Sequence, residues 1–98
     1  MMWEFPFVFA PLFPLGRVGI AQQADDVIKE RDEILLCLQR HALGDWGDIH
    51  KNDIGLNEEA LVQGGRLLSV YYTSSGTRFW IITEADRSAT TVLLPEEY

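Results

Sequence analysis

Hydrophobic and polar residues change their spacing in three stages along the chain. Residues 15–20 carry three apolar side chains and two glycines, a pattern typical of a short β-strand with a bulge or a close backbone approach. Residues 24–63 repeat apolar side chains three and four positions apart, as amphipathic helices do. From residue 66 the pattern becomes strand-like again. The spacing therefore predicts a strand, then helices, then a group of strands.

The middle of the chain predicts two to three helices. The first covers residues 24–30 and has acidic residues near its positive N-terminus. The second begins at Asp32, whose side chain can cap it, runs to His41 or Leu43 and stops at Gly44. The third covers residues 52–63. The side chains expected to face the core are Leu35, Leu38 and Ala42 in the second helix, and Ile54, Leu56, Leu61 and Val62 in the third.

The last third of the chain predicts three strands. Residues 66–73 and 77–83 form a hairpin around the turn Ser74-Ser75-Gly76, and residues 89–94 form a third strand that Pro95 ends. The expected fold class is α+β. It consists of a short N-terminal strand, the helices, and a three-stranded antiparallel β-meander packed on them, in one domain over residues 15–98.

An apolar, proline-rich extension, residues 1–14, precedes this domain. It is shorter than the about 20 residues that a membrane-spanning helix needs, carries Glu4, and is interrupted by Pro6, Pro11 and Pro14. It also lacks the basic segment and cleavage site of a secretory signal. We therefore expect no membrane contact and a cytoplasmic location. The extension could lie along its own domain as an edge strand, or form a homodimer by docking onto a second copy.

Composition narrows the function classes further. Of the 98 residues, 47% are hydrophobic and 23% are charged, which is typical of a globular protein. The 15 acidic and 8 basic residues give a net charge of −7, which argues against direct nucleic-acid binding. That charge suits a basic partner protein, but it also serves solubility alone. Charge mimicry of a nucleic acid would need one helical face to carry Asp25, Asp26, Glu30, Asp32 and Glu33.

The single cysteine, Cys37, lies in an apolar helical run. It has no partner in the chain for a disulfide, and we expect a buried thiol without nucleophilic chemistry in a reducing compartment.

The segment around Asp45, Trp46 and Asp48 holds the densest set of potential metal ligands. Two histidines, His41 and His50, flank these aspartates. The spacing matches no zinc or calcium motif, so we expect no metal and no cofactor. The alternative is a connecting loop in which both aspartates cap the next helical turn and Trp46 fills the core.

A second candidate site follows the most apolar strand. Glu84 and Asp86 could act as an acid/base pair, with Arg87 binding an anion bidentately, if Asp45 or Asp48 faced them across a cleft. Alternatively, Asp86 binds backbone groups of its own turn and Arg87 bridges to a nearby carboxylate.

A third set of residues suits a protein interface. Arg66 and Arg78 stand near the starts of neighbouring strands and are expected to add positive charge to one end of the sheet. Strand alternation puts Tyr71 and Tyr72 on opposite faces, so at most one of them lines the core. The other, together with Trp80, is an interface candidate. No catalytic or phosphate-binding motif accompanies these residues.

Three runs of residues suggest a family: HALGDWGDI, NEEALVQGGRLLSVY and GTRFWIITEADRSATTVLLPEEY. Over residues 15–98 the chain resembles a family of small bacterial proteins labelled plasmid-related, which usually lack an extension like residues 1–14. The resemblance implies no activity, cofactor or substrate class. It implies an accessory or counter-defence factor of a mobile element that works by binding a protein. We therefore expect a non-enzymatic interaction protein; the alternative is a small-molecule-binding protein or hydrolase that uses the Glu84, Asp86 and Arg87 loop.

Overall fold

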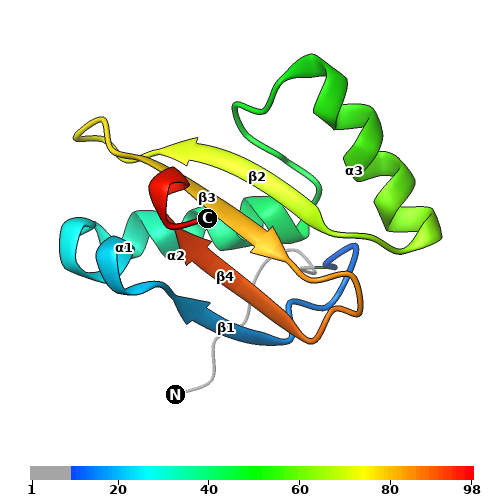
Figure 1. Cartoon of the computed structure of the whole chain (residues 1–98), viewed down its shortest axis with the longest axis horizontal. Coiled ribbons are helices and arrows are strands. Elements are labelled where there is room, and N and C mark those ends of the chain that lie inside the picture. Colours follow the sequence, from blue (N-terminus) through cyan, green and yellow to red (C-terminus); the bar gives the residue numbers. More distant parts are fainter. Residues whose placement is uncertain (1–9) are drawn as a thin grey trace.

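A four-stranded mixed sheet, in the order β1-β4-β3-β2, lies at the centre of residues 10–98, the part of the chain that the computed structural model describes (Figure 1). Strands β2 (Leu67–Tyr72), β3 (Arg78–Thr83) and β4 (Ala89–Leu93) form an antiparallel meander. Strand β1 (Arg17–Ile20) pairs with β4 in parallel. The α+β class is confirmed, but the sheet is mixed and is not the antiparallel meander alone, because β1 joins it beside β4. The helices between β1 and β2 carry the chain back across the sheet, so β2 and β4 run in the same direction as β1.

The helices cover one face and one edge of this sheet (Figure 1). Helices α1 (Gln22–Val27) and α2 (Arg31–Ala42) pack on the same face, and α3 (Lys51–Gln63) lies beside β2. A short 3₁₀ helix, η1 (Pro95–Glu97), turns back over the opposite face.

Two apolar clusters hold these layers together. The larger lies between α1, α2 and the sheet, and its members include Ala24, Ile28, Ile34, Cys37, Leu38, Phe79, Ile81 and Val92. The smaller joins Phe13, Trp46, Ala60 and Leu67 under α3. The predicted burial of Trp46 and of Cys37 is therefore confirmed.

The predicted core face of α2 is confirmed at Leu38 and Ala42 but wrong at Leu35, which is 62% exposed. Ile34 and His41 are buried in addition. The helix also starts earlier than expected: Glu30 is its N-cap and Asp32 lies in the first turn, so the predicted cap is wrong. His41 can take a core position although it is polar, because its ring nitrogens bond to hydroxyl groups of the sheet.

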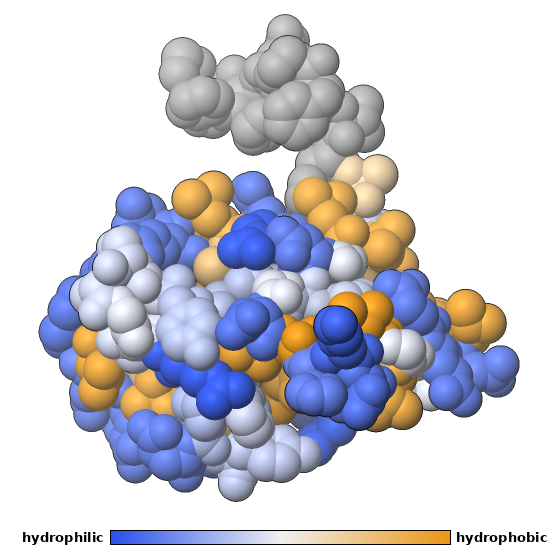
Figure 2. Space-filling model, turned by 90° about the horizontal axis from the view of Figure 1, so that it is seen from above, coloured by the Kyte–Doolittle hydropathy of each residue, from blue (hydrophilic) through white to orange (hydrophobic). Residues whose placement is uncertain are grey.

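The predicted apolar stripe of α3 is confirmed at Leu61, which packs against the smaller cluster, and is wrong at its other three residues. Ile54, Leu56 and Val62 are exposed, and the buried residues of this helix include Asn57 and Ala60. The helix packs against the edge of β2, where polar backbone groups need an amide partner more than an apolar one. Apolar side chains reach the surface in separate patches between hydrophilic ones (Figure 2).

The last residues of the extension pack into the domain. The Leu12 N–H donates to the Ala42 carbonyl at the end of α2 (2.8 Å), and Phe13 is buried. The predicted packing of the extension, as an edge strand or at a dimer contact, concerns mainly residues 1–9, which lie outside the described residues. Within residues 10–98, no helix has the length and apolar character needed to cross a membrane.

Candidate functional site

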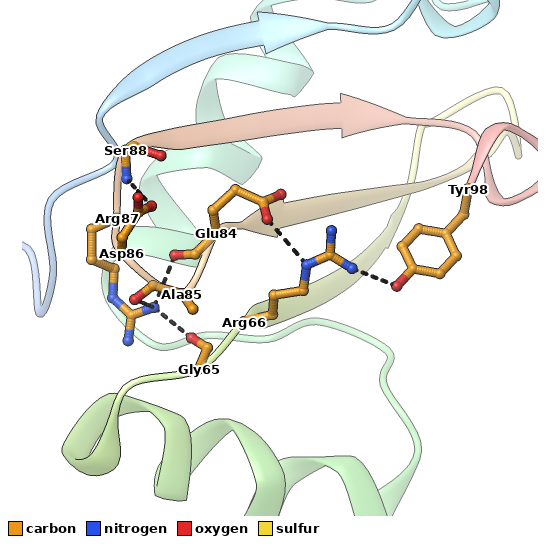
Figure 3. Close-up of polar contacts among 8 residues, drawn as sticks. All are labelled: Gly65, Arg66, Glu84, Ala85, Asp86, Arg87, Ser88 and Tyr98. Carbon is orange, nitrogen blue, oxygen red and sulfur yellow. Dashed lines mark hydrogen bonds and ion pairs between the residues drawn. The ribbon is translucent and has the colours of Figure 1, made fainter.

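Arg87 joins the β3–β4 turn to the end of α3. Its guanidinium donates to the backbone carbonyls of Gly65, Ala60 (2.9 Å) and Glu84 (3.1 Å), as Figure 3 shows for Gly65 and Glu84. Its backbone adopts a positive φ of 62°, which orients the side chain toward α3. Arg87 therefore bridges as the structural alternative expected, but to carbonyls instead of a carboxylate, and the bidentate anion clamp is not formed.

The two carboxylates of the same turn serve different partners. The Asp86 side chain accepts from the Ser88 N–H (3.0 Å), and hydrogen bonds from Ser88 lower the pKa of Asp86. Glu84 accepts from Arg66 Nε (3.1 Å). Figure 3 shows the two carboxyl groups pointing apart. The geometry therefore does not assemble the predicted acid/base pair.

The loop with Asp45, Trp46 and Asp48 is fixed to the edge of β2. The Asp48 N–H donates to the Val70 carbonyl (2.7 Å), and the Val70 N–H donates to the Trp46 carbonyl (3.1 Å). Asp45 pairs with Arg40 (2.7 Å), which lowers the pKa of Asp45.

The predicted capping of α3 by these aspartates is wrong. The N-cap of α3 is His50, whose ring nitrogen accepts the Asn52 N–H (3.2 Å). Asp45 instead accepts from Gly47 within its own loop. The loop must reach β2 before α3 begins, which places both aspartates too early to cap the helix.

The two acidic loops are not brought together. Asp48 lines a shallow depression of about 260 Å³ with Arg40 and Tyr71, near the end of β2. Glu84 follows Thr83, which pairs with Leu67 at the start of β2. A second depression, of about 270 Å³, lies beside β1. Neither depression is lined by a residue of the 84–87 turn, so neither is the cleft that the hydrolase hypothesis requires.

The remaining predicted residues lie on the sheet face opposite α1 and α2. We call this surface the outer face. It is made by Arg17, Arg66, Tyr72, Arg78, Trp80 and Tyr98. Tyr71 is buried and Tyr72 is 51% exposed, so the prediction that they separate is confirmed. Because β2 and β3 run antiparallel, Arg66 and Arg78 lie at opposite ends of this face, not at one end as predicted.

An aromatic and cationic cluster occupies the middle of the outer face. Arg66 Nη1 donates to the Tyr98 hydroxyl (2.7 Å), and the Tyr98 and Trp80 rings meet edge to face with centroids 5.5 Å apart. The Trp80 indole N–H is buried and has no hydrogen-bond partner within residues 10–98. A buried donor without an acceptor is unusual in a folded protein.

A buried polar network is the main feature that the sequence analysis missed. Both ring nitrogens of the fully buried His41 contact hydroxyls, those of Ser69 (2.6 Å) and Thr83 (2.9 Å). Thr83 continues to Thr90 (2.7 Å), whose hydroxyl donates to the Leu15 carbonyl (2.7 Å). The available signal was a histidine at helical spacing from Ile34 and Leu38, matched by hydroxyl residues at inward positions of the strands.

This network is structural. Phe13 and Trp46 pack against the His41 ring at centroid distances of 5.3 and 5.7 Å, so no substrate can reach the histidine–serine pair. Burial, with a smaller contribution from the positive charge of Arg87, lowers the pKa of His41 to about 4. Burial likewise raises the pKa of the Cys37 thiol, which opposes thiolate chemistry. No group of three or more acidic, histidine or cysteine side chains in residues 10–98 could hold a metal ion.

No family model, curated protein or solved structure matches this chain. The resemblance to plasmid-related proteins therefore stays a prediction from the sequence. The function must be inferred from the geometry of the chain's own residues.

Proposed function

We propose that this chain is a non-enzymatic protein-interaction module that binds a partner protein through the outer face. The observation that carries this proposal is the cluster of Tyr72, Trp80 and Tyr98 with Arg66 and Arg78 on a sheet face that, apart from η1, no helix crosses in Figure 1. The few residues that dominate the binding energy of protein interfaces are enriched in tryptophan, tyrosine and arginine.

The aromatic residues of this face differ in what a partner can reach. The Trp80 indole N–H is buried, so a partner would contact the partly exposed ring and not its N–H. Tyr98 packs edge to face on Trp80 and is 69% exposed, and Tyr72 is 51% exposed. The contact is therefore expected to centre on Tyr72 and Tyr98, with Trp80 supporting Tyr98.

Local charge favours a partner surface that carries carboxylates. Arg17, Arg66 and Arg78 belong to the outer face, and Glu84 is already paired with Arg66. The acidic helices suit a basic partner less well than the net charge suggests, because several of their acids have contacts within the chain. Asp25 pairs with Arg31, Glu30 accepts from Ser75, and Glu33 accepts from Ser74 (2.7 Å).

An accessory or counter-defence factor of a mobile element would act in this way, by occupying one surface of a host or element protein. The competing small-molecule or hydrolase function finds less support, because Glu84, Asp86 and Arg87 each serve a separate structural contact.

Affinity purification of the tagged full-length protein from its native host tests the proposal. The baits are wild type, Tyr72→Ala, Arg78→Glu and the control Val62→Ala, which alters an 81% exposed residue of α3. Circular dichroism establishes that each variant is folded. We expect wild type and the control to retain the same protein partner. With that partner purified, the dissociation constant should be at least about tenfold larger for Tyr72→Ala and Arg78→Glu than for wild type.

Two outcomes would contradict the proposal. If the partner binds all four baits equally, the outer face is not the interface. If the bound material is single-stranded nucleic acid, the arginine and aromatic side chains serve a different class of ligand.

A further inference from the structure

The two edge strands of the sheet, β2 and β1, differ in whether their outward backbone groups are hydrogen-bonded. At the β2 edge, the Asn57 side-chain amide donates to the Leu68 carbonyl (2.7 Å) and accepts from the Leu68 N–H (3.1 Å). The neighbouring Val70 is paired on both its backbone groups with the loop that contains Trp46 and Asp48. This edge is therefore closed to any further strand.

The β1 edge is open within residues 10–98. The N–H groups of Arg17 and Ala21 donate to Ser88 (3.0 Å) and Val92 (2.8 Å) on the β4 side. Backbone groups alternate in direction along a strand, so the N–H and C=O groups of Val18 and Ile20 point away from β4. β1 is the first strand in the sheet order, has no proline, and carries a single charged residue, Arg17, at its first position.

An apolar groove runs beside this open edge. A depression of about 270 Å³ lies between β1 and α2, lined mainly by Val18, Ile20, Ile34, Leu35, Leu38 and Val92. Val18 is 46% exposed and Leu35 is 62% exposed. Unpaired backbone groups next to exposed apolar side chains favour the addition of a further β-strand.

We propose that β1 pairs with β1 of a second copy of this chain, antiparallel and about a two-fold axis at Gly19. The outward residues Val18 and Ile20 lie symmetrically around Gly19, so each would form a hydrogen-bonded pair with the other residue in the second copy. Gly19 would face Gly19 of the second copy at the close, non-hydrogen-bonded position. Within residues 10–98, and apart from its two chain neighbours, no atom lies within 4 Å of where a Cβ of Gly19 would be. The strand is thus complementary to itself.

Closure supports this partner over an unrelated strand. Pairing of β1 with β1 of a second copy leaves neither β1 edge open, whereas an unrelated added strand would present a new open edge of its own. Because the β2 edge is covered, the two sheets join into one and growth stops at a dimer.

The solution mass of the full-length protein tests the dimer. Light scattering after size exclusion should give about 22 kDa, twice the 11.2 kDa of one chain. We expect Val18→Lys and Leu35→Glu to halve this mass, since each puts a charge into the contact. The control Val62→Lys changes an exposed residue of α3 and should leave the dimer intact. A full-length monomer at every concentration, or a dimer that survives folded Val18→Lys, overturns the proposal.

A cysteine at the two-fold axis tests the register. Opposed residues at a non-hydrogen-bonded position have Cα atoms about 4.5 Å apart, within the range of a disulfide. Gly19→Cys should therefore form a covalent dimer on mild oxidation much faster than the control Val62→Cys, while the buried Cys37 stays reduced. Equal rates for the two variants overturn the two-fold pairing at Gly19.

Discussion

His41 occupies a core position that an apolar residue would ordinarily fill. Hydroxyls from Ser69 and Thr83 contact both of its nitrogens, and the ring is fully buried. This environment satisfies the neutral imidazole. Burial removes the charged form from bulk water, and no carboxylate of residues 10–98 bonds to the ring. The pKa of about 4 follows from that burial.

Acid should therefore weaken the fold in a defined pH window. The unfolded chain takes up a proton at His41 near the ordinary pKa of 6.5, whereas the folded protein does so only near 4. The contribution of the neutral His41 to the free energy of unfolding should be complete above pH 6.5, and the free energy of unfolding should fall by about 3 kcal/mol between there and pH 4. Urea unfolding at several pH values measures this slope.

The variant His41→Gln is the comparison for this pH dependence. If it folds, it should lose most of the slope between pH 6.5 and 4. Asp45 and Asp86 interfere little, because their pKa values are lowered from 3.8 and their own loss of stability lies mostly below this window. The pKa values of Glu30 and Glu97 are lowered from 4.5 and overlap its acid end, so wild type and variant are compared above about pH 5. A wild-type slope in the variant would show that another group is responsible.

At the scale of elements, α3 stabilises the domain by completing the sheet edge more than by burying a hydrophobic stripe. Asn57 replaces the missing strand with one amide that both donates to and accepts from Leu68. Ala60 and Leu61 provide apolar contact to the smaller cluster. The helix therefore depends on one polar residue near its middle.

Replacing this amide should expose the edge. We expect Asn57→Ala to lower the free energy of unfolding by about 2 kcal/mol, because the Leu68 N–H and C=O lose their partner. Amide hydrogen exchange at Leu68 should also become faster. The control Asn52→Ala, at the exposed start of α3, should change stability much less. Unchanged exchange at Leu68 in Asn57→Ala would mean that water or a neighbour replaces the amide at no cost.

At the scale of the whole molecule, the C-terminus closes the fold against its N-terminal half. The Glu97 carboxylate accepts from the N–H groups of Gln23 (2.8 Å) and Ala24 (3.0 Å) at the start of α1. Burial alone would raise the pKa of Glu97, but these bonds and one from Leu94 lower it overall. A residue next to the chain end thus holds a helix that begins 75 positions earlier.

The substitution Glu97→Ala should loosen α1 without unfolding the sheet. We expect faster hydrogen exchange at Gln23 and Ala24, since both N–H groups lose their acceptor at a helix N-terminus. Exchange within β3 should be unchanged. Glu96→Ala, one residue away, is the matched control because Glu96 makes no such contact with α1 among the described residues. Equal effects of the two variants would contradict this role of Glu97.

Local patterns in the sequence determined the meander, the approximate helix positions and several burial states. Strand alternation separates Tyr71 from Tyr72, and apolar neighbours on its helix bury Cys37. Trp46 enters the core as its surroundings predict. These features were predictable because the side-chain periods of 2 and 3.6 residues depend only on the local chain.

Only the tertiary structure decided which faces and partners these elements use. The parallel pairing of β1 with β4 depends on the path of the helices, and the burial of His41 on α2 depends on hydroxyls from three strands. Arg66 and Tyr98 meet from positions 32 residues apart, and Arg87 binds carbonyls 22 and 27 residues away. Such contacts carry no local period, because they arise only when distant segments pack together.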